Sequence, residues 1–558
     1  MAPVRCSLRS RWSSENAHTR RLIPLAPLPD AEDTHRGRGF NFFMTEGITM
    51  LECVALKGFS LTSIRKRWST WVGLAFLVGA TAVAKTQENS RNSPPNIVLT
   101  GEVKGAQNKT YFEVPFKVPS GTHRISVDFQ YTGKEERATL DLGIADPERF
   151  RGQSGGNKSQ FTISETDATP SYLPGAIPAG EWKLLIAVPN MRAQTVAHFH
   201  AEIRFNSREE DSSFTLHPLV AGKRWYRGDL HMHTAHSDGS CASQSGAKVP
   251  CPVFVSVQTA AERGLDFIAI TDHNADSQYD AERELQPYFD RVLLIPGREM
   301  TTFYGHFNIF GVTQFVDYRI TPGGLDLNTV LEDVKSKGGI ASVNHAESPD
   351  GEVCMGCRWE PAAGVDMSLF AAVEVINGGP FMLSSAKYWD AQLREGHRLS
   401  AVGGSDSHNA TNPARPGGSI GWPTTAVEAD ELSVPAILHG IRAGRTFVDL
   451  TASHDKVVDF EAESGGAHAR MGEALHVDAG AKIGVRIQTA GCTGLVVHLL
   501  LDGGEVTAVP PLPVDSASRP VEATLTASSG RHWLRVEVRD SKGSLQLVSS
   551  PIYINFPD

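Results

Sequence analysis

Hydrophobic and polar residues follow three successive patterns along the chain. Over residues 96–205, apolar and polar residues alternate in short runs that are separated by Gly, Pro, Asn and Lys. Such runs are typical of β-strands joined by turns, and no helical periodicity of convincing length interrupts them. We therefore expect an N-terminal β-sandwich of jelly-roll type over residues 95–215.

After a polar joint at residues 206–213, apolar strand-like segments alternate with segments of helical character. Seven strands are predicted, at residues 225–233, 266–271, 291–295, 306–312, 340–344, 372–376 and 399–403. Four helices, each followed or ended by a glycine, are predicted at residues 252–264, 327–338, 384–396 and 431–444. Alternating strands and helices favour a mostly parallel sheet, and seven βα units predict a distorted (β/α)7 barrel over residues 222–452.

Strand-like alternation returns near residue 455, and the segments DGGEV and SKGS fit hairpin turns. This pattern predicts a C-terminal Ig-like β-sandwich over residues 454–558, in which the sequence indicates no catalytic cluster. The expected fold class is therefore multidomain, an α/β barrel flanked by two all-β domains.

The N-terminal stretch has the layout of a targeting segment. Basic residues at 64–68 precede 14 largely apolar residues at 71–84, which end in the small-residue sequence AVA. This run is short for a membrane span, so we predict a signal peptide over residues 63–84 that is cleaved after Ala84. An uncleaved anchor is the alternative. We expect residues 1–62 to be an unstructured leader outside the mature protein, and the protein to be periplasmic or secreted.

Composition narrows the possible partners. The chain of 558 residues has a net charge of −10 and a pI near 6.1, which argues against a general nucleic-acid or anionic-membrane binder. No nucleic-acid partner is indicated, and no stable membrane span is expected if the signal is cleaved. The acidic balance says little about small phosphate substrates, because bound metal ions supply local positive charge.

Seven cysteines are informative if the protein is exported. Cys241 and Cys251 bracket a short loop, and Cys354 and Cys357 form a CxxC motif. Both pairs are interpreted as disulfides that hold loops of the central domain, with half a zinc site as the alternative for the CxxC motif. Cys492 is expected to be a buried free thiol.

Residues 228–239, GDLHMHTAHSDG, hold three histidines and two aspartates. In a strand, His231 and His233 lie two residues apart and leave the same face. His236 and Asp238 follow in a Ser-Asp-Gly turn. Neighbouring imidazoles with a carboxylate are ligands suited to Zn, Mn or Fe, and a polar strand end capped by a turn is the alternative interpretation.

Further polar groups stand at the edges of the later strands. Asp272 and His273 follow the second predicted strand, and Glu299 follows the third. The others are His306, His345, Asp406 and His408. The carboxyl ends of parallel barrel strands meet at one rim, so we expect these side chains to converge.

These motifs resemble those of a known superfamily. GDLHMHTAHSDG, ITDHN, GREMTTFYGHFNIFG, NHAE and GGSDSHN are similar, in this order, to the motifs of the PHP (polymerase and histidinol phosphatase) superfamily. Their spacing, together with GHFNIFG and HGIRAGRTFV, is more similar to exported CehA/McbA-type metallohydrolases. The resemblance covers residues 225–450 and implies a seven-unit βα barrel with a multinuclear metal site.

Carried over position by position, the resemblance implies a site for two to three divalent ions (Zn, Mn or Fe). The implied metal ligands are His231, His233, Asp238, His273, Glu299, His306, His345, Asp406 and His408. Glu299 would bridge two ions, and Asp238 would serve a different ion from His231 and His233. His236 is a candidate acid, or a group that supports a ligand.

Two further residues are catalytic candidates. Asp272 is either an acid/base group or the group that orients a ligand histidine, and the second role is favoured. Arg298 stands where the superfamily more often has valine or isoleucine. It is therefore either a substrate contact or a surface residue.

The chemistry that such a site performs is hydrolysis. We expect an exported metal-dependent hydrolase in which a metal-bridging hydroxide cleaves a phosphomonoester or phosphodiester of a small molecule. The alternative on the same site is hydrolysis of a carbamate or of an aromatic ester or amide. A second alternative is a non-catalytic exported protein that binds glycan or another polymer, and in either case the β domains are candidates for glycan or cell-surface contact.

Overall fold

The computed structural model describes residues 94–155, 158–206, 214–215, 217–352, 354–361, 363–379, 382–516 and 519–557. The expected leader, the signal peptide and its cleavage site lie outside these residues. Among the described residues, no helix is both long enough and apolar enough to cross a membrane.

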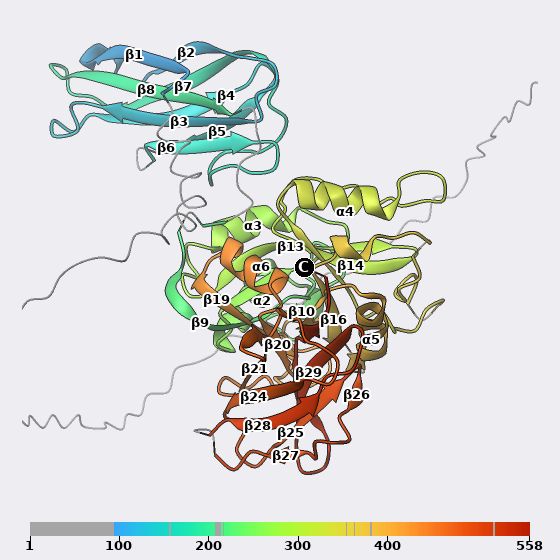
Figure 1. The fold of residues 1–558 in the computed structure, drawn as a ribbon. Coiled ribbons are helices and arrows are strands. Elements are labelled where there is room, and N and C mark those ends of the chain that lie inside the picture. The colour runs from blue at the N-terminus through green and yellow to red at the C-terminus, as the bar shows by residue number, and fades with distance from the viewer. Residues whose placement is uncertain are drawn as a thin grey trace, which may run out of the picture. The chain divides into compact units, whose positions relative to one another are not determined.

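The first described part is built from two antiparallel four-stranded sheets (Figure 1). One sheet has the order β1 (Ile97–Lys104), β8 (Val196–Asn206), β3 (Arg124–Tyr131), β6 (Gln160–Ser164), and the other has the order β2 (Tyr111–Val118), β7 (Gly180–Asn190), β4 (Thr139–Ala145), β5 (Phe150–Ser154). A 3-10 helix, Gly105–Gln107, follows β1. Alternate residues along β8 are buried, and both sheets contribute to one apolar core. The predicted alternation therefore produces two sheets packed face to face.

The strands that carry the candidate site follow one another through hydrogen-bonded pairs. In spatial order they are β9 (Val220–Asp229), β12 (Phe267–Ile270), β13 (Leu293–Thr302), β14 (Gly305–Phe310), β15 (Ile340–Val343), β16 (Ala372–Asn377) and β18 (Ser400–Gly404). A parallel bridge between Met232 and Ser407 connects the chain beyond β18 to the chain beyond β9. The ends of the first and last strands are thereby brought together.

The structure contains a helix at each of the four predicted positions. These are α2 (Val253–Glu262), α4 (Leu327–Ser336), α5 (Ala386–Glu395) and α6 (Val434–Arg442). Asp326 caps α4 by accepting a hydrogen bond from the Thr329 amide, and Ser433 caps α6 in the same way. A fifth helix, α3 (Gln278–Leu285), was not expected, because its eight residues, QYDAEREL, are mostly polar or charged.

A regular (β/α)7 barrel is not confirmed. β14 runs antiparallel to both of its neighbours and follows β13 after a two-residue turn, Phe303-Tyr304, without a helix. Between β15 and β16 the described helical structure is a 3-10 turn, Met367–Leu369. Apolar periodicity predicts where each strand lies but not its direction. The antiparallel hairpin of β13 and β14 was therefore interpreted as two separate βα units.

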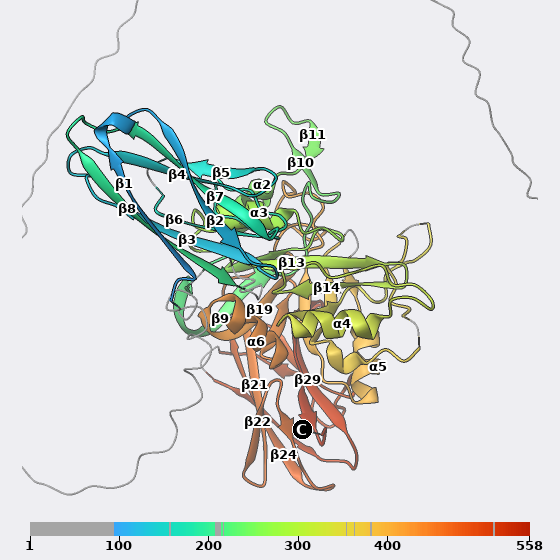
Figure 2. The same cartoon turned by 90° about the horizontal axis from the view of Figure 1, so that it is seen from above.

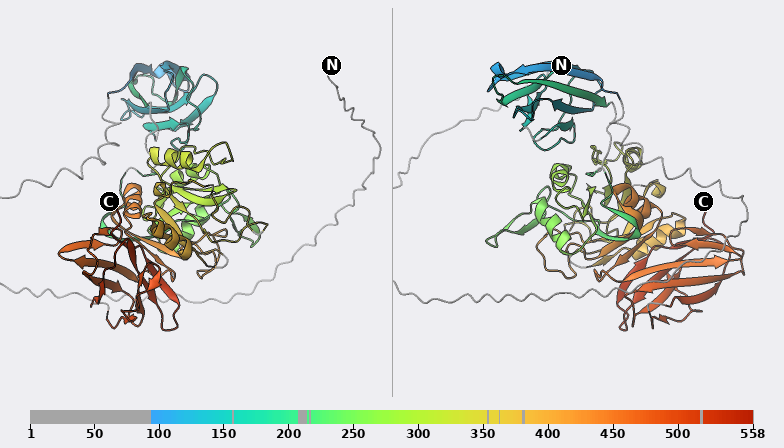
Figure 3. Two further views of the ribbon diagram at one scale, coloured as in Figure 1. Left: turned by 45° about the vertical axis from the view of Figure 1, so that its right-hand side comes forward. Right: turned by 90° about the vertical axis from the view of Figure 1, so that its left-hand side faces the viewer.

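Two strands that the sequence did not predict, β19 (Thr424–Leu432) and β20 (Thr446–Asp449), extend this sheet towards the predicted C-terminal strands. β19 pairs with β9 and with β20, and β20 pairs with β30 (Leu545–Ser549). The same sheet continues through β29 (His532–Arg539), β25 (Val496–Leu501) and β31 (Ile552–Ile554), with the short strands β23 (Ala474–Leu475), β26 (Gly504–Glu505) and β27 (Leu512–Pro513). Figure 3 shows these C-terminal strands in two further views.

A second sheet of the C-terminal part has the order β22 (Ala467–Arg470), β21 (Val457–Ser464), β24 (Lys482–Ala490), β28 (Val521–Thr526). It shares an apolar core with the extended sheet, and Cys492 is a buried free thiol in this core, as expected. Three short strands complete the fold, the hairpin β10 (Ser240–Ala242) and β11 (Lys248–Pro250), and β17 (Leu383–Ser384).

Cys241 pairs with Cys251, and Cys354 pairs with Cys357. The first disulfide joins the ends of the β10–β11 hairpin, which projects from the central strands in Figure 2. None of the metal-competent groups found among the described residues contains a cysteine, so the half-zinc-site interpretation of the CxxC motif has no support.

A buried arginine joins the central strands to the C-terminal part. The Arg445 side chain is 9% exposed, and its Nε lies 3.0 Å from the Glu428 carboxylate on β19. Its Nη1 and Nη2 donate to the two oxygens of Asp459 on β21, at 3.0 and 2.9 Å. Such a two-point pair orients both partners, and removal of Arg445 would leave Arg470, whose side chain is 40% exposed, as the remaining partner shared by both carboxylates.

We expect Arg445→Ala to lower the free energy of unfolding by about 3 kcal/mol, because Asp459 and Glu428 would be left without their main cation. Urea denaturation followed by fluorescence measures this loss. Arg486→Ala is the matched control, since the Arg486 side chain is 57% exposed and pairs with Glu461 at 3.6 Å. It should cost less than about 1 kcal/mol, and equal losses for the two variants would contradict the assignment.

Candidate metal centre

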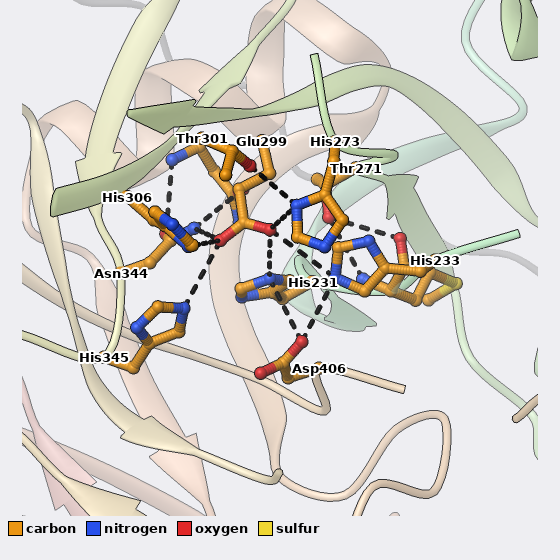
Figure 4. Close-up of polar contacts among 12 residues, drawn as sticks. His231, His233, Thr271, His273, Glu299, Thr301, His306, Asn344, His345 and Asp406 are labelled. Atoms are coloured by element: carbon orange, nitrogen blue, oxygen red, sulfur yellow. Dashed lines mark hydrogen bonds and ion pairs between the residues drawn. The ribbon is translucent and has the colours of Figure 1, made fainter. Parts of the chain in front are cut away.

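The Glu299 carboxylate stands at the middle of the candidate site (Figure 4). β13 is buried along nearly its whole length, and Glu299 is 1% exposed. One carboxylate oxygen, Oε2, faces histidines that follow β9 and β12, whereas Oε1 faces histidines on β14 and after β15. One carboxylate therefore lies between two sets of imidazoles.

The first set contains His231, His233 and Asp406. The Nε2 atom of His231 lies 3.4 Å from Glu299 Oε2 and 3.4 Å from Asp406 Oδ1. The Nε2 atom of His233 lies 3.1 Å from the same oxygen of Asp406. Both histidines lie just beyond the end of β9 rather than within it, yet their rings face one site as the sequence predicted.

The second set contains His306 and His345. His306 Nδ1 and His345 Nε2 each lie 3.3 Å from Glu299 Oε1. The hairpin places His306 correctly, because β14 pairs His306 with Thr301 and so puts it on the same face of the sheet as Glu299. Asn344 fixes this side of the carboxylate by donating a hydrogen bond to Oε1 at 2.9 Å.

A third set is more exposed. Asp238 Oδ1 lies 3.6 Å from His273 Nε2 and 3.4 Å from His408 Nε2, and His233 completes the group. The side chains of Asp238 and His408 are 60% and 42% exposed, so this set faces solvent. His273 also reaches Glu299 through Nδ1, at 2.9 Å, which connects the third set to the first.

The structure thus gathers all nine sequence-predicted ligands into four overlapping groups of metal-competent atoms, each group within 4.8 Å. The donors are imidazole nitrogens and carboxylate oxygens, which suit Zn, Mn or Fe. His231 Nε2 and Glu299 Oε2 are buried and face each other, and neither makes a well-aligned hydrogen bond among the described residues, although His273 Nδ1 lies 2.9 Å from Oε2. A cation between them would satisfy both atoms, so the residues fit a divalent metal.

The charges of the site favour metal binding by the carboxylates. Burial alone would raise the pKa of Glu299 and of Asp406, but the neighbouring histidines lower both pKa values well below their usual range. Burial and the nearby His408 and His273 lower the pKa of His233 to about 4, despite its bond to Asp406. His233 is therefore a neutral imidazole at pH 7, the form that binds metal.

Glu374 supports this site, and the sequence analysis missed it. It lies on β16, is 2% exposed, and its Oε1 lies 3.0 Å from His231 Nδ1. Its Oε2 accepts hydrogen bonds at 3.0 Å from the His345 amide and from the Asn377 side chain. A proton held on Nδ1 by Glu374 leaves Nε2 of His231 free for metal. The sequence did contain a sign of this role, because Glu374 is the only charged residue in the apolar segment AAVEVI of a predicted strand.

Close packing brings β18 up to His231. A Cβ atom added at Gly404 would lie 2.3 Å from the His231 Cβ and 2.8 Å from Glu374 Oε1, so only glycine fits there. Asp229 is fully buried and accepts hydrogen bonds from the amides of His231, Ser405 and Gly421. These contacts fix the backbone on both sides of the first histidine.

The three catalytic candidates lie around the site in different ways. Asp272 is fully buried and accepts hydrogen bonds from the Thr234 amide and hydroxyl and from the Ser237 hydroxyl. It therefore holds the loop that follows His233. His236 is half-buried, contacts Ser277 through Nδ1 at 2.7 Å, and is in none of the metal-competent groups.

Arg298 requires a correction. It is 1% exposed, so the surface interpretation is wrong. Alternation along β13 turns its side chain to the face opposite Glu299, where the guanidinium lies 5.7 Å from the Tyr279 ring and donates to the Gln314 carbonyl. This position does not bring Arg298 into the groups around Glu299.

We expect Glu374→Gln to weaken metal binding about 10- to 100-fold. The Glu374 carboxylate can accept a hydrogen bond from each of its three donors, which are the His231 ring, the His345 amide and the Asn377 side chain. The glutamine side chain would instead turn its own N–H group towards one of these donors. Competition with a chromophoric chelator measures the metal affinity, and the Co²⁺ absorption spectrum reports the ligand geometry. Glu284→Gln, an exposed glutamate on α3, is the control, and an unchanged affinity in Glu374→Gln would contradict the role.

The pH dependence follows from His273. Burial opposes its charge, but Glu299 and Asp238 outweigh burial and raise the pKa of His273 from 6.5 to about 9 in the metal-free protein. Its contribution to stability is therefore complete below pH 6.5 and is lost as the pH rises through about 9. Metal must displace this proton, so binding at pH 7.5 should release protons and release fewer at pH 10.

Calorimetry in buffers of different ionisation enthalpy measures this release. His273→Gln should lower the number of protons released at pH 7.5. His198→Ala, an exposed histidine of β8, should leave it unchanged. An equal release from wild type and His273→Gln would show that another group carries the proton.

Two known proteins are similar to parts of this chain. No family model matches the chain. A solved structure, a two-domain protein of Bacteroides vulgatus containing a predicted PHP-like metal-dependent phosphoesterase, superposes on this chain with a TM-score of 0.33. The two sequences are 18% identical, and the superposition covers 60% of this chain and 96% of the other. A TM-score of this size does not establish a common fold. MJ1587, an uncharacterized protein of Methanocaldococcus jannaschii, is 31% identical over 126 residues, which are 22% of this chain and 69% of the relative. By this identity and coverage, the chain belongs to the family of MJ1587.

Proposed function

We propose that this chain is a metal-dependent hydrolase of the PHP superfamily that cleaves a phosphoester of a small molecule. One observation carries the proposal: the buried Glu299 carboxylate turns one oxygen to His231 and His273 and the other to His306 and His345. A carboxylate with imidazoles on both sides fits the bridging ligand of a site for two divalent ions. The ordered motifs that resemble the PHP superfamily support the same conclusion.

When bound, the ions would supply a hydroxide at neutral pH and polarise the ester. The protein residues position these ions and control access. His231 is oriented by Glu374, His233 is neutral, and the side chains of Glu299, His306 and His345 are each less than 10% exposed. The exposed third set, with Asp238 and His408, lies on the side from which a substrate can enter and could hold a third ion.

We extend the proposal to the CehA/McbA-type branch and to an exported, periplasmic or secreted protein with its signal peptide cleaved after Ala84. The motif spacing and the hydrophobic run at residues 71–84 support these two points. The Cys241–Cys251 and Cys354–Cys357 pairs are consistent with an oxidising compartment. We further propose that the flanking β-sheets contact glycan or the cell surface.

A carbamate or aromatic ester or amide is the second candidate substrate. Phe303, in the turn between Glu299 and His306, is 83% exposed, and Met355 is 78% exposed. The Met355 loop packs on this turn, because a Cβ atom on Gly356 would lie 3.1 Å from the Phe303 Cα. Two exposed apolar residues at the turn of the hairpin that carries Glu299 and His306 favour a substrate with an apolar leaving group.

We expect purified protein to carry two to three divalent ions per chain and to hydrolyse nitrophenyl phosphate or bis-nitrophenyl phosphate with added Mn or Zn. His231→Ala with His233→Ala should lose both the ions and the activity, because two of the buried donors are removed. Metal analysis and a colorimetric assay measure the two effects, with His198→Ala as the control.

The outcomes separate the alternatives. Preferential turnover of a naphthyl carbamate would transfer the assignment to the second substrate class. Full metal occupancy without turnover of any of the three substrates would contradict the hydrolase proposal. Protein purified without metal would favour the non-catalytic binding protein.

A further inference from the structure

We propose a second, metal-independent catalytic site in the C-terminal part, in which Ser528 is a nucleophile that cleaves small acyl esters. The Ser528 hydroxyl lies 2.8 Å from His532 Nε2, and His532 Nδ1 lies 2.6 Å from Asp502 Oδ2. A hydroxyl, an imidazole and a carboxylate joined in this order form the arrangement of a nucleophile, a general base and the group that orients the base.

Tertiary structure alone assembles these residues. Asp502 directly follows β25, and His532 is the first residue of β29, its hydrogen-bonded neighbour. Ser528 lies in the turn between β28 and β29. Because Asp502 is 30 residues from His532 in the sequence, no short motif contains all three residues.

Asp502 is held in place by the neighbouring strand. Its amide donates to the Trp533 carbonyl at 3.0 Å, and its Oδ1 accepts from the Trp533 amide at 3.2 Å. The other oxygen is thus directed at His532, and it favours the tautomer that carries the proton on Nδ1. In that tautomer Nε2 has the free electron pair that accepts the Ser528 proton.

The surroundings can stabilise the charges of the reaction. The Ser529 carbonyl lies 3.0 Å from His532 Nε2 and can accept a hydrogen bond from the imidazolium once the proton has moved. The amides of Ser529 and Gly530 donate to no other group among the described residues. In the proposed site these amides would donate to the oxyanion that forms beside Ser528, the role that the amide after the nucleophile has in serine hydrolases.

The proposed reaction has two balanced steps. Ser528 Oγ attacks the acyl carbonyl carbon while its proton moves to His532 Nε2, and the tetrahedral oxyanion collapses as the imidazolium protonates the departing alkoxide. Water, deprotonated by His532, then attacks the acyl-serine and releases the carboxylic acid, which restores the Ser528 hydroxyl. Ser528 lies in an exposed turn, so the substrate class is an ester with a small, accessible acyl group.

The test uses the full chain treated with EDTA, so that metal-dependent hydrolysis does not contribute. We expect a fluorophosphonate probe to label Ser528, as located by peptide mass spectrometry, and nitrophenyl acetate to be hydrolysed. Ser528→Ala should abolish both. His532→Gln and Asp502→Asn should each lower the labelling rate about 100-fold, because the base is lost or held in the wrong tautomer.

Ser541→Ala, which changes an exposed serine of another turn, is the matched control and should react like wild type. His231→Ala with His233→Ala should also keep the labelling, so failure of this proposal is distinguishable from failure of the proposed metal-dependent function. The proposal is overturned if Ser528 is not labelled in folded wild type, or if His532→Gln, shown to be folded by circular dichroism, reacts as fast as wild type.

Discussion

A buried carboxylate that must be compensated governs this structure. Glu299 is almost completely removed from water, and an isolated ionised carboxylate in such a place would cost several kcal/mol. The histidines on both sides of it supply that compensation through protons in the metal-free protein, and divalent ions would supply it in the holoprotein. Four of the strands around Glu299 end, or begin, at a histidine that faces this carboxylate: His231 after β9, His273 after β12, His306 on β14 and His345 after β15.

Residues that are not themselves predicted ligands hold the metal-binding side chains in position. β16 carries none of the predicted ligands, yet Glu374 holds His231 and the His345 backbone, and Asn377 lies 3.3 Å from Asp406 Oδ2. His345 and Asp406 themselves adopt positive φ angles, 24° and 50°. Such conformations are unfavourable for residues with a side chain, and they occur where the surrounding structure fixes a functional group.

Two expectations were wrong for physical reasons that the sequence cannot express. Apolar alternation identified the segment of β14 but not its direction, and the antiparallel hairpin is what turns His306 onto the face of Glu299. The same alternation turns Arg298 away from Glu299 and into contact with Tyr279. Arg298 and Glu299, neighbours in sequence, therefore lie on opposite faces of β13, and Arg298 is neither a surface residue nor a member of the groups around Glu299.

The sequence alone determined which residues can bind metal and where the strands that carry them lie, because donor chemistry and apolar periodicity are local properties. Four helices and the polar groups at the strand edges were predicted in this way, and the resemblance to the PHP superfamily selected the nine donor residues among them. Only the tertiary structure decided that Glu299 lies between two sets of histidines, that Glu374 stands behind His231, and that Asp502 meets His532. These are contacts between distant segments, and they depend on strand order, direction and register, which no local pattern specifies.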